Sequence, residues 1–239
     1  MILAAGRGTR MRPLTDTTPK PLLRVGGRML IERHLERLAA IGIDEVVINT
    51  SHLAGQFPAA LGDGARWSLR IRYSEEGPQP LDSGGGIAHA LPLLGAGAFI
   101  AVNGDVWTDF DFSTLRPAPE TLAHLVLIDN PPHHPRGDFG IDAAGRLHAR
   151  PDSPPVGALR ALTFSGIGVY RPELFADWRR HVGDQSGADA MPPRFSIVPL
   201  LRALMPAGQV TWQRHAGEWG DIGTPERLAE LDRALQTRH

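Results

Sequence analysis

The feature that most constrains the fold is the alternation of short apolar segments with segments of helical spacing. Residues 1–5, 45–49 and 99–102 have the length and apolar character of buried strands. Between the first two, residues 30–41 place apolar side chains at helical spacing, and Gly42 ends that pattern. This alternation predicts an α/β fold in which helices cover both faces of a largely parallel sheet, giving three layers.

The rest of the chain continues this alternation. We expect further strands at 69–73, 124–128 and 162–170, and further helices at 87–94, 197–205 and 225–236. Glycine and proline are spread between these segments as loop markers, and we expect residues 1–239 to form a single domain. In an open α/β sheet a ligand lies beyond the carboxyl ends of the strands, so the site is expected in loops such as those after Ala5 and Val102.

The composition excludes several classes of function. A formal net charge of -1 gives no general attraction for nucleic acid or for an acidic membrane. The sequence has no cysteine, which excludes disulfides, thiolate metal sites and a cysteine nucleophile, and fits a reducing compartment. No segment approaches the roughly 18 apolar residues of a membrane-spanning helix, and the first residues lack a secretory pattern. We therefore expect a cytoplasmic protein without nucleic-acid or membrane partners.

A glycine-rich segment with clustered cations follows the first strand. Gly6 and Gly8 allow backbone N–H groups to come close to phosphate oxygens. Four cationic side chains lie within the next 14 residues, namely Arg7, Arg10, Arg12 and Lys20. The pattern predicts a polyanionic ligand such as a nucleoside triphosphate, although a glycine turn beside solvated arginines is the alternative for these residues alone. The spacing fits neither the dinucleotide fingerprint nor the P-loop.

Taken whole, this segment resembles the signature of the sugar-1-phosphate nucleotidylyltransferases. It has LAAGRGTRMRPLT at residues 3–15 and PKPL at residues 19–22. The resemblance implies a Rossmann-like nucleotidyltransferase fold with a mixed, mostly parallel central sheet. It also implies an enzyme that joins a nucleoside triphosphate to a sugar 1-phosphate and releases pyrophosphate.

The resemblance assigns roles to single residues of the segment. Positions that face the nucleotide base or wrap its phosphates match Leu3, Ala4, Gly6, Gly8 and Thr9. Arg10 matches a residue of the same phosphate loop, and Lys20 matches the lysine that reaches the α-phosphate. Attack on the α-phosphate builds negative charge on its oxygens, which a fixed cation stabilises. Arg10 and Lys20 are therefore the catalytic candidates.

Two further motifs contain candidate metal ligands. Asn103-Gly104-Asp105 follows the strand at 99–102, and WGDIGT occupies residues 219–224. A carboxylate at the carboxyl end of a strand suits a hard cation that is held against phosphates. By themselves, the first motif is also typical of a turn and the second of a helix start. In the family the aspartate of each motif binds Mg²⁺, which makes Asp105 and Asp221 the candidate ligands.

The segment LDSGGG at residues 81–86 matches the family loop that contacts the base. It gives Asp82, Ser83 and Gly84 as nucleotide-binding candidates. The family more often has glycine and threonine where this chain has Asp82 and Ser83, so the base preference stays open. A glycine-rich turn is the alternative for this segment.

Candidate sugar-binding residues come from weaker matches. They are Asn103, Gly137, Arg150, Thr163 and Ser165, with Arg150 standing where many relatives have the lysine of an EKP motif. His133 and His134 are neighbours, and neighbouring side chains on an extended chain point apart, so a solvated loop is expected there rather than a metal site.

Three longer segments are similar to the family members that act on N-acetylmuramate 1-phosphate. They are NGDVWTD at residues 103–109, the stretch from Ala123 to Phe139, and LTFSGIGVY at residues 162–170. This resemblance implies UTP and N-acetylmuramate 1-phosphate as substrates, and a role in peptidoglycan recycling. The alternatives are a glucose- or mannose-1-phosphate nucleotidylyltransferase using UTP, dTTP or GTP, or a regulatory subunit that senses nucleotides without turnover. The sequence does not decide between a monomer and a homo-oligomer.

Overall fold

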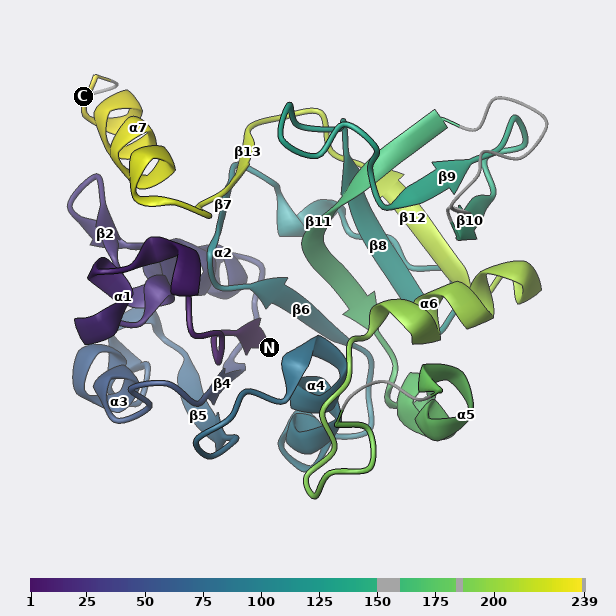
Figure 1. Cartoon of the computed structure of the whole chain (residues 1–239), viewed down its shortest axis with the longest axis horizontal. Helices are drawn as coiled ribbons and strands as arrows, with labels where there is room; N and C mark the ends of the chain where they lie inside the picture. The colour runs from purple at the N-terminus through teal and green to yellow at the C-terminus, as the bar shows by residue number, and fades with distance from the viewer. Residues whose placement is uncertain (150–159, 184–186, 238–239) are drawn as a thin grey trace.

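A central mixed sheet with helices on both sides organises the molecule (Figure 1). We describe it from a computed structural model, in which residues 1–149, 160–183 and 187–237 are described. The sheet strands are β1 (Ile2–Leu3), β4 (Glu45–Thr50), β5 (Arg70–Glu75), β6 (Phe99–Asn103), β8 (Ala123–Ile128), β9 (Phe139–Ile141), β10 (Leu147–Ala149), β11 (Arg160–Tyr170) and β12 (Val210–Arg214). Two small ribbons pair β2 (Arg24–Val25) with β3 (Arg28–Met29) and β7 (Val106–Thr108) with β13 (Trp219–Asp221).

The α-helices lie mostly between the strands in sequence. They are α1 (Leu14–Thr17), α2 (Leu30–Ala40), α3 (Gln56–Leu61), α4 (Asp82–Leu94), α5 (Trp178–Val182), α6 (Val198–Leu204) and α7 (Pro225–Gln236). In two of them a capping hydrogen bond explains where the helix begins. Glu32 accepts a hydrogen bond from the Met29 N–H at 2.7 Å at the start of α2, and Thr224 caps α7 by accepting from the Arg227 N–H at 3.4 Å.

The sheet combines parallel and antiparallel pairing. β1 lies between β4 and β6 and is parallel to both, β5 continues the parallel half, and β12 is parallel to β8. The antiparallel pairs are those of β11 with β6, β8 and β9, and of β10 with β9. The predicted α/β class with a mixed central sheet is confirmed.

Alternate residues of the central strands enter two separate cores. Val46 and Ile48 of β4 pack with residues of α2 and α3, whereas Val47 packs on the other face with residues of α4, α5 and α6. The period of two along a strand explains this division, because successive side chains point to opposite faces. A third, smaller core joins α7 and β2 with Met11 and Trp107.

The start of α4 differs from its sequence prediction. We expected a glycine turn followed by a helix from Ile87, but the helix begins at Asp82 and includes all three glycines. A Cβ on Gly84 would lie 2.5 Å from the Phe195 ring, and one on Gly85 would lie 2.4 Å from the Pro193 carbonyl oxygen. Close packing therefore requires glycine in this helix, although glycine disfavours helices by propensity.

Several elements were not predicted because they are short or weakly patterned. They are the helices α1, α3 and α5, the strand β12, the hairpin strands β9 and β10, and the two ribbons. Within the described part of the chain, every helix is too short or too polar to span a membrane.

Candidate active site

The candidate site lies where three neighbouring parallel strands end. β4, β1 and β6 are adjacent in the sheet and run in the same direction, so the loops that follow them meet at one edge. The end of β4 and the loops after β1 and β6 border a cavity of about 660 Å³. Its lining residues are Leu3, Ala4, Ala5, Gly6, Arg7, Gly8, Thr9, Arg10, Met11, Lys20, Pro21, Asn49, Pro80, Asp82, Ser83, Asn103, Asp105, Arg194 and Gly223.

The glycine loop after β1 is compact and turns one edge toward the cavity. Gly8 has φ +60, and its carbonyl oxygen accepts from the Thr15 hydroxyl and from the Met11 N–H, both at 2.8 Å. A Cβ on Gly8 would meet the Thr15 methyl group at 2.9 Å. Among the described residues, nothing lies within 4 Å of the place a Cβ on Gly6 would take. A phosphate can therefore approach the backbone closely at Gly6.

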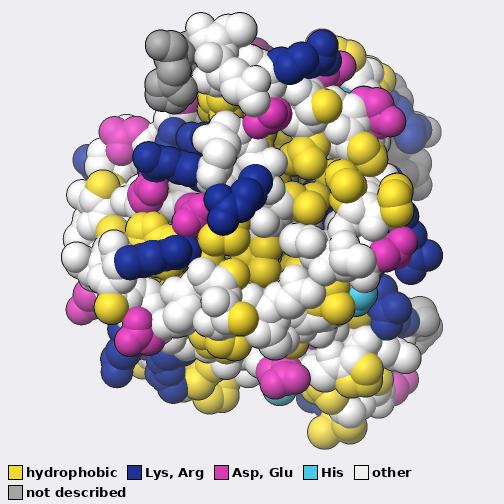
Figure 2. Space-filling view, turned by 90° about the vertical axis from the view of Figure 1, so that its left-hand side faces the viewer, with side chains coloured by type: hydrophobic (Ala, Val, Ile, Leu, Met, Phe, Trp, Pro, Cys, Tyr) yellow, Lys and Arg dark blue, Asp and Glu magenta, His cyan; other side chains and the backbone are white. Residues whose placement is uncertain are grey.

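Cationic side chains gather at this site. Arg7, Arg10 and Lys20 line the cavity, whereas Arg12 pairs with Asp16 at 3.0 Å and is largely exposed. Figure 2 shows the face that carries α1, α3 and α7, where Lys and Arg side chains lie among Asp and Glu side chains beside apolar surface. The three cationic side chains that line the cavity suit a polyphosphate.

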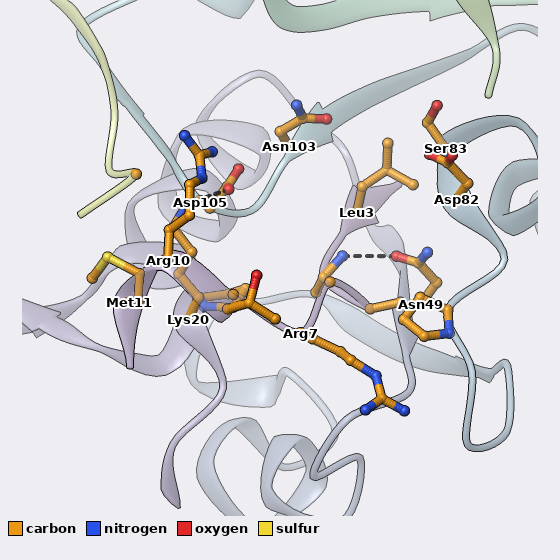
Figure 3. A pocket seen from close by; sticks show the side chains of 18 of the residues that line it. Leu3, Arg7, Arg10, Met11, Lys20, Asn49, Asp82, Ser83, Asn103 and Asp105 are labelled. Carbon is orange, nitrogen blue, oxygen red and sulfur yellow. Dashed lines mark hydrogen bonds and ion pairs between the residues drawn. The ribbon is translucent and has the colours of Figure 1, made fainter. Parts of the chain in front are cut away.

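Lys20 and Asp105 form an ion pair on the cavity wall. The Lys20 Nζ lies 2.5 Å from Asp105 Oδ2, and the lysine side chain is only 8% exposed against 38% for the aspartate. Lys20 sits in a short turn after α1, and Asp105 follows β6 in the loop that leads to β7. The turn and the loop thus hold a fixed ammonium group and a carboxylate against each other beside the glycine loop (Figure 3).

The second predicted metal ligand comes from a distant part of the sequence. β13 pairs with β7 so that Asp221 lies opposite Val106, and the Ile222 N–H donates to the Asp105 carbonyl oxygen at 3.2 Å. The fold therefore places Asp221 of β13 beside the start of β7, which directly follows Asp105. The Asp221 carboxylate also accepts from Arg227 at 2.8 Å and lies 2.9 Å from His133 Nε2.

The other end of the cavity is formed by β1 and the start of α4. Leu3, Ala4, Asp82 and Ser83 line it, and in Figure 3 Leu3, Asp82 and Ser83 lie away from Arg10 and Asp105. Gly84 lies behind this wall, where its N–H donates to the Phe195 carbonyl oxygen at 2.9 Å. The predicted nucleotide-binding residues thus lie on one continuous surface or directly beneath it.

Two buried polar residues support this end. The Ala4 N–H donates to Asn49 Oδ1 at 2.8 Å, and Asn49 Nδ2 donates to Glu76 Oε1 at 2.6 Å. Burial raises the pKa of Glu76, and hydrogen bonds from Leu81 and Asn49 oppose that shift. Neither Asn49 nor Glu76 was predicted, although Asn49 could have been found because it lies at the carboxyl end of a predicted central strand.

The predicted sugar-binding residues are not all at the cavity. Asn103 lines it, whereas Thr163 donates its hydroxyl to Asn130 at 2.9 Å and Ser165 donates to the Val126 carbonyl oxygen at 2.7 Å. Ser165 is fully buried, so its hydroxyl is used inside the sheet. Arg150 lies outside the described residues.

Gly137 belongs to the loop after β8. It has φ +62, and a Cβ there would meet Asn130 Oδ1 at 2.5 Å and the Leu162 carbonyl oxygen at 2.7 Å. In the same loop the two histidines point to different partners, His133 to Asp221 and His134 to Asp138. The contact of His133 with a predicted metal ligand was missed, as was the presence of Arg194 in the cavity wall.

Comparisons with known proteins agree with the arrangement. The family model described as Nucleotidyl transferase matches residues 1–238. The chain is 49% identical over 238 residues to the N-acetylmuramate alpha-1-phosphate uridylyltransferase of Neisseria meningitidis serogroup B, covering 96% of this chain and 95% of that protein. It is 32% identical to the protein of the same name from Caulobacter vibrioides, with 96% of each covered.

A solved structure extends the likeness to three dimensions. HddC from Yersinia pseudotuberculosis, complexed with GMP-PN, superposes with a TM-score of 0.74 and covers 98% of this chain and 97% of that one. At 20% identity this likeness concerns the fold. Because the family model spans nearly the whole chain and two relatives of similar length are named as uridylyltransferases, the chain belongs to the nucleotidyl transferase family and is an enzyme of the transferase class.

Proposed function

We propose that the enzyme joins UTP and N-acetylmuramate 1-phosphate, giving UDP-N-acetylmuramate and pyrophosphate for peptidoglycan recycling. The observation that carries the reaction type is the buried Lys20 paired with Asp105 beside a glycine loop, with Asp221 on the adjoining strand. The two relatives named as N-acetylmuramate uridylyltransferases support the substrates. The family match over residues 1–238 supports a single catalytic domain, and the absence of cysteine fits the cytoplasm as its location.

The proposed reaction is an in-line displacement at the α-phosphorus. A phosphate oxygen of the sugar 1-phosphate forms a bond to the α-phosphorus, and the bond to the bridging oxygen breaks so that pyrophosphate leaves with its electron pair. Lys20 stabilises the charge that grows on the α-phosphate, and Arg10 stabilises the departing pyrophosphate. The attacking phosphate is already ionised near neutral pH, so the step needs no general base.

The residues present fit a magnesium ion. Asp105 and Asp221 would hold it, because one carboxylate just before β7 and one on the paired strand β13 offer the hard oxygen ligands that Mg²⁺ prefers. When bound, the ion neutralises charge on both reacting phosphates. Asp221, which contacts His133 and Arg227, would give up these contacts to hold the ion.

The nucleotide would occupy the cavity, with its base at the end formed by β1 and the start of α4. The uracil lies against Leu3, Ala4, Gly6 and the start of α4 with Asp82, Ser83 and Gly84, while Gly8 and Thr9 meet the β- and γ-phosphates. The proposed sugar contacts are Asn103, Gly137, Arg150, Thr163 and Ser165. Of these, Asn103 lines the cavity, whereas Thr163 and Ser165 are buried and both hydroxyls are bonded to other residues.

Pyrophosphate release in the presence of Mg²⁺ tests the proposal. Four nucleoside triphosphates are each paired with the 1-phosphates of N-acetylmuramate, glucose and mannose. We expect turnover with UTP and N-acetylmuramate 1-phosphate. Turnover only with glucose or mannose 1-phosphate would overturn the substrate and keep the reaction class. No release with any pair would favour a regulatory, nucleotide-sensing protein.

A further inference from the structure

Asn49 and Glu76 connect the two walls at the nucleotide end of the cavity. Both residues are buried, with exposed fractions of 2% and 6%. The Ala4 N–H donates to Asn49, which donates to Glu76 Oε1, and the Leu81 N–H donates to Glu76 Oε2 at 2.7 Å. Figure 3 shows the first of these bonds. An unbroken row of three hydrogen bonds thus runs from the loop after β1 to the residue before α4.

The direction of each hydrogen bond determines which side chains can occupy positions 49 and 76. Both ends of the row are backbone N–H groups, which only donate, and Asn49 supplies one accepting and one donating group. Glu76 must therefore accept with both oxygens, which an ionised carboxylate does. A glutamine at position 76 has one accepting oxygen and one donating NH₂ group, so two donors would face each other. The mismatch lies at the Leu81 N–H, or at the Ala4 N–H if the side-chain amides of residues 76 and 49 are both flipped.

Helix α4 packs closely against this row. A Cβ on Gly86 would lie 2.4 Å from Glu76 Oε1 and 2.8 Å from Asn49 Nδ2, so the N-terminal part of α4 rests directly on both side chains. Asp82 and Ser83 at the start of the same helix line the cavity, and Ala4 and Asn49 line it too. Any shift of Glu76 is therefore passed to both walls.

We propose that Glu76 is a positioning residue, which acts through Asn49 and Leu81 to fix the spacing between the walls of the nucleotide-base slot. The inference rests on the proposed function, because it takes the base of a nucleoside triphosphate as the occupant of this slot. Glu76 itself lies behind the wall. It sets the affinity for the nucleotide, whereas other residues bind the reacting phosphates.

An exchange of side chains that conserves the net charge tests this row of hydrogen bonds. Glu76→Gln and Asn49→Asp are made singly and together. In the double variant the new carboxylate at position 49 accepts from Ala4 and from the new amide at position 76, whose oxygen accepts from Leu81, so every hydrogen bond of the row is restored. We expect each single variant to raise KM for UTP by about tenfold or more with a smaller change in kcat. The double variant returns KM to within about threefold of the wild type.

Amide exchange of Ala4 in the free protein gives a second readout that needs no turnover. We expect faster exchange in both single variants and recovered protection in the double variant. This measurement tests the row of hydrogen bonds even if UTP is not the substrate. His124→Leu is the matched control, because it removes buried hydrogen bonds to Thr211 and Gln213 away from the cavity. It should lower stability without raising KM. A folded double variant in which Ala4 protection is not recovered overturns the inference, whether or not UTP is the substrate.

Discussion

Replacing Lys20 with methionine should abolish most of the catalysis while leaving the fold intact. Methionine fills a similar volume but removes the positive charge that is buried against Asp105. Loss of a fixed group that stabilises transition-state charge costs about 3–4 kcal/mol, which corresponds to a factor of about 10²–10³ in kcat. We therefore expect kcat to fall by that factor.

Lys20→Met should lower the free energy of unfolding only slightly, because the partner carboxylate of Asp105 is partly exposed. The Asp105 side chain is 38% exposed, so water can solvate the carboxylate that loses its lysine, and the loss of the pair costs about 0–1 kcal/mol. Urea unfolding measures this term, and pyrophosphate release with saturating substrates measures kcat. Circular dichroism of the two proteins should be the same.

A matched control comes from the same motif. Arg12 is 62% exposed and pairs with Asp16 outside the cavity, so Arg12→Met removes a nearby cation without touching the site. Its kcat should stay within about threefold of the wild type. A Lys20→Met variant that retains kcat to within the same factor, or an equal loss of activity in both variants, would show that the Lys20 charge does not stabilise the transition state.

Three further perturbations test other parts of the structure. Asp221→Asn should raise the Mg²⁺ concentration needed for half-maximal pyrophosphate release, because one carboxylate ligand is lost. Burial lowers the pKa of His34 to about 4, below its unfolded value of 6.5, so stability present above pH 6.5 is lost as the pH falls towards 4. Urea unfolding should therefore show that the wild type loses about 2 kcal/mol more than His34→Gln between about pH 7.5 and pH 5. Gly84→Ala should destabilise the protein by about 1–3 kcal/mol in urea, because its Cβ would overlap the Phe195 ring.

Much of the fold could be predicted because its strands are continuous apolar runs. Residues 45–49 and 99–102 read as buried strands, and both lie in the parallel half of the sheet. The ribbon formed by β7 and β13 could not be predicted, since each strand has three residues and its partner lies far along the chain. Pairing at such a distance leaves no periodic signal in either segment.

The site could be predicted where a residue lies in a contiguous motif. Arg10, Lys20 and Asp105 do, and all three line one cavity. Glu76 could not be found this way, because Glu75 beside it has the same chemistry and is exposed, and only the packing of α4 distinguishes them.

Ser165 illustrates a second limit of sequence patterns. It lies in an irregularity of β11, where the register with β8 shifts between Phe164 and Ile167. The usual alternation of inward and outward side chains does not hold across such a shift. The strand was therefore predictable, while the direction of this hydroxyl was not.

The pairing of β13 with β7 has a consequence for how the two predicted metal ligands are kept together. Lys20 and Asp105 lie in the first half of the chain, whereas Asp221 lies on β13, just before α7, which packs against β2 and the residues around Trp107. Local opening of this C-terminal segment would separate Asp221 from Asp105 while the Lys20–Asp105 pair stayed in place. Hydrogen exchange at the Ile222 N–H, which donates to the Asp105 carbonyl oxygen, reports this opening.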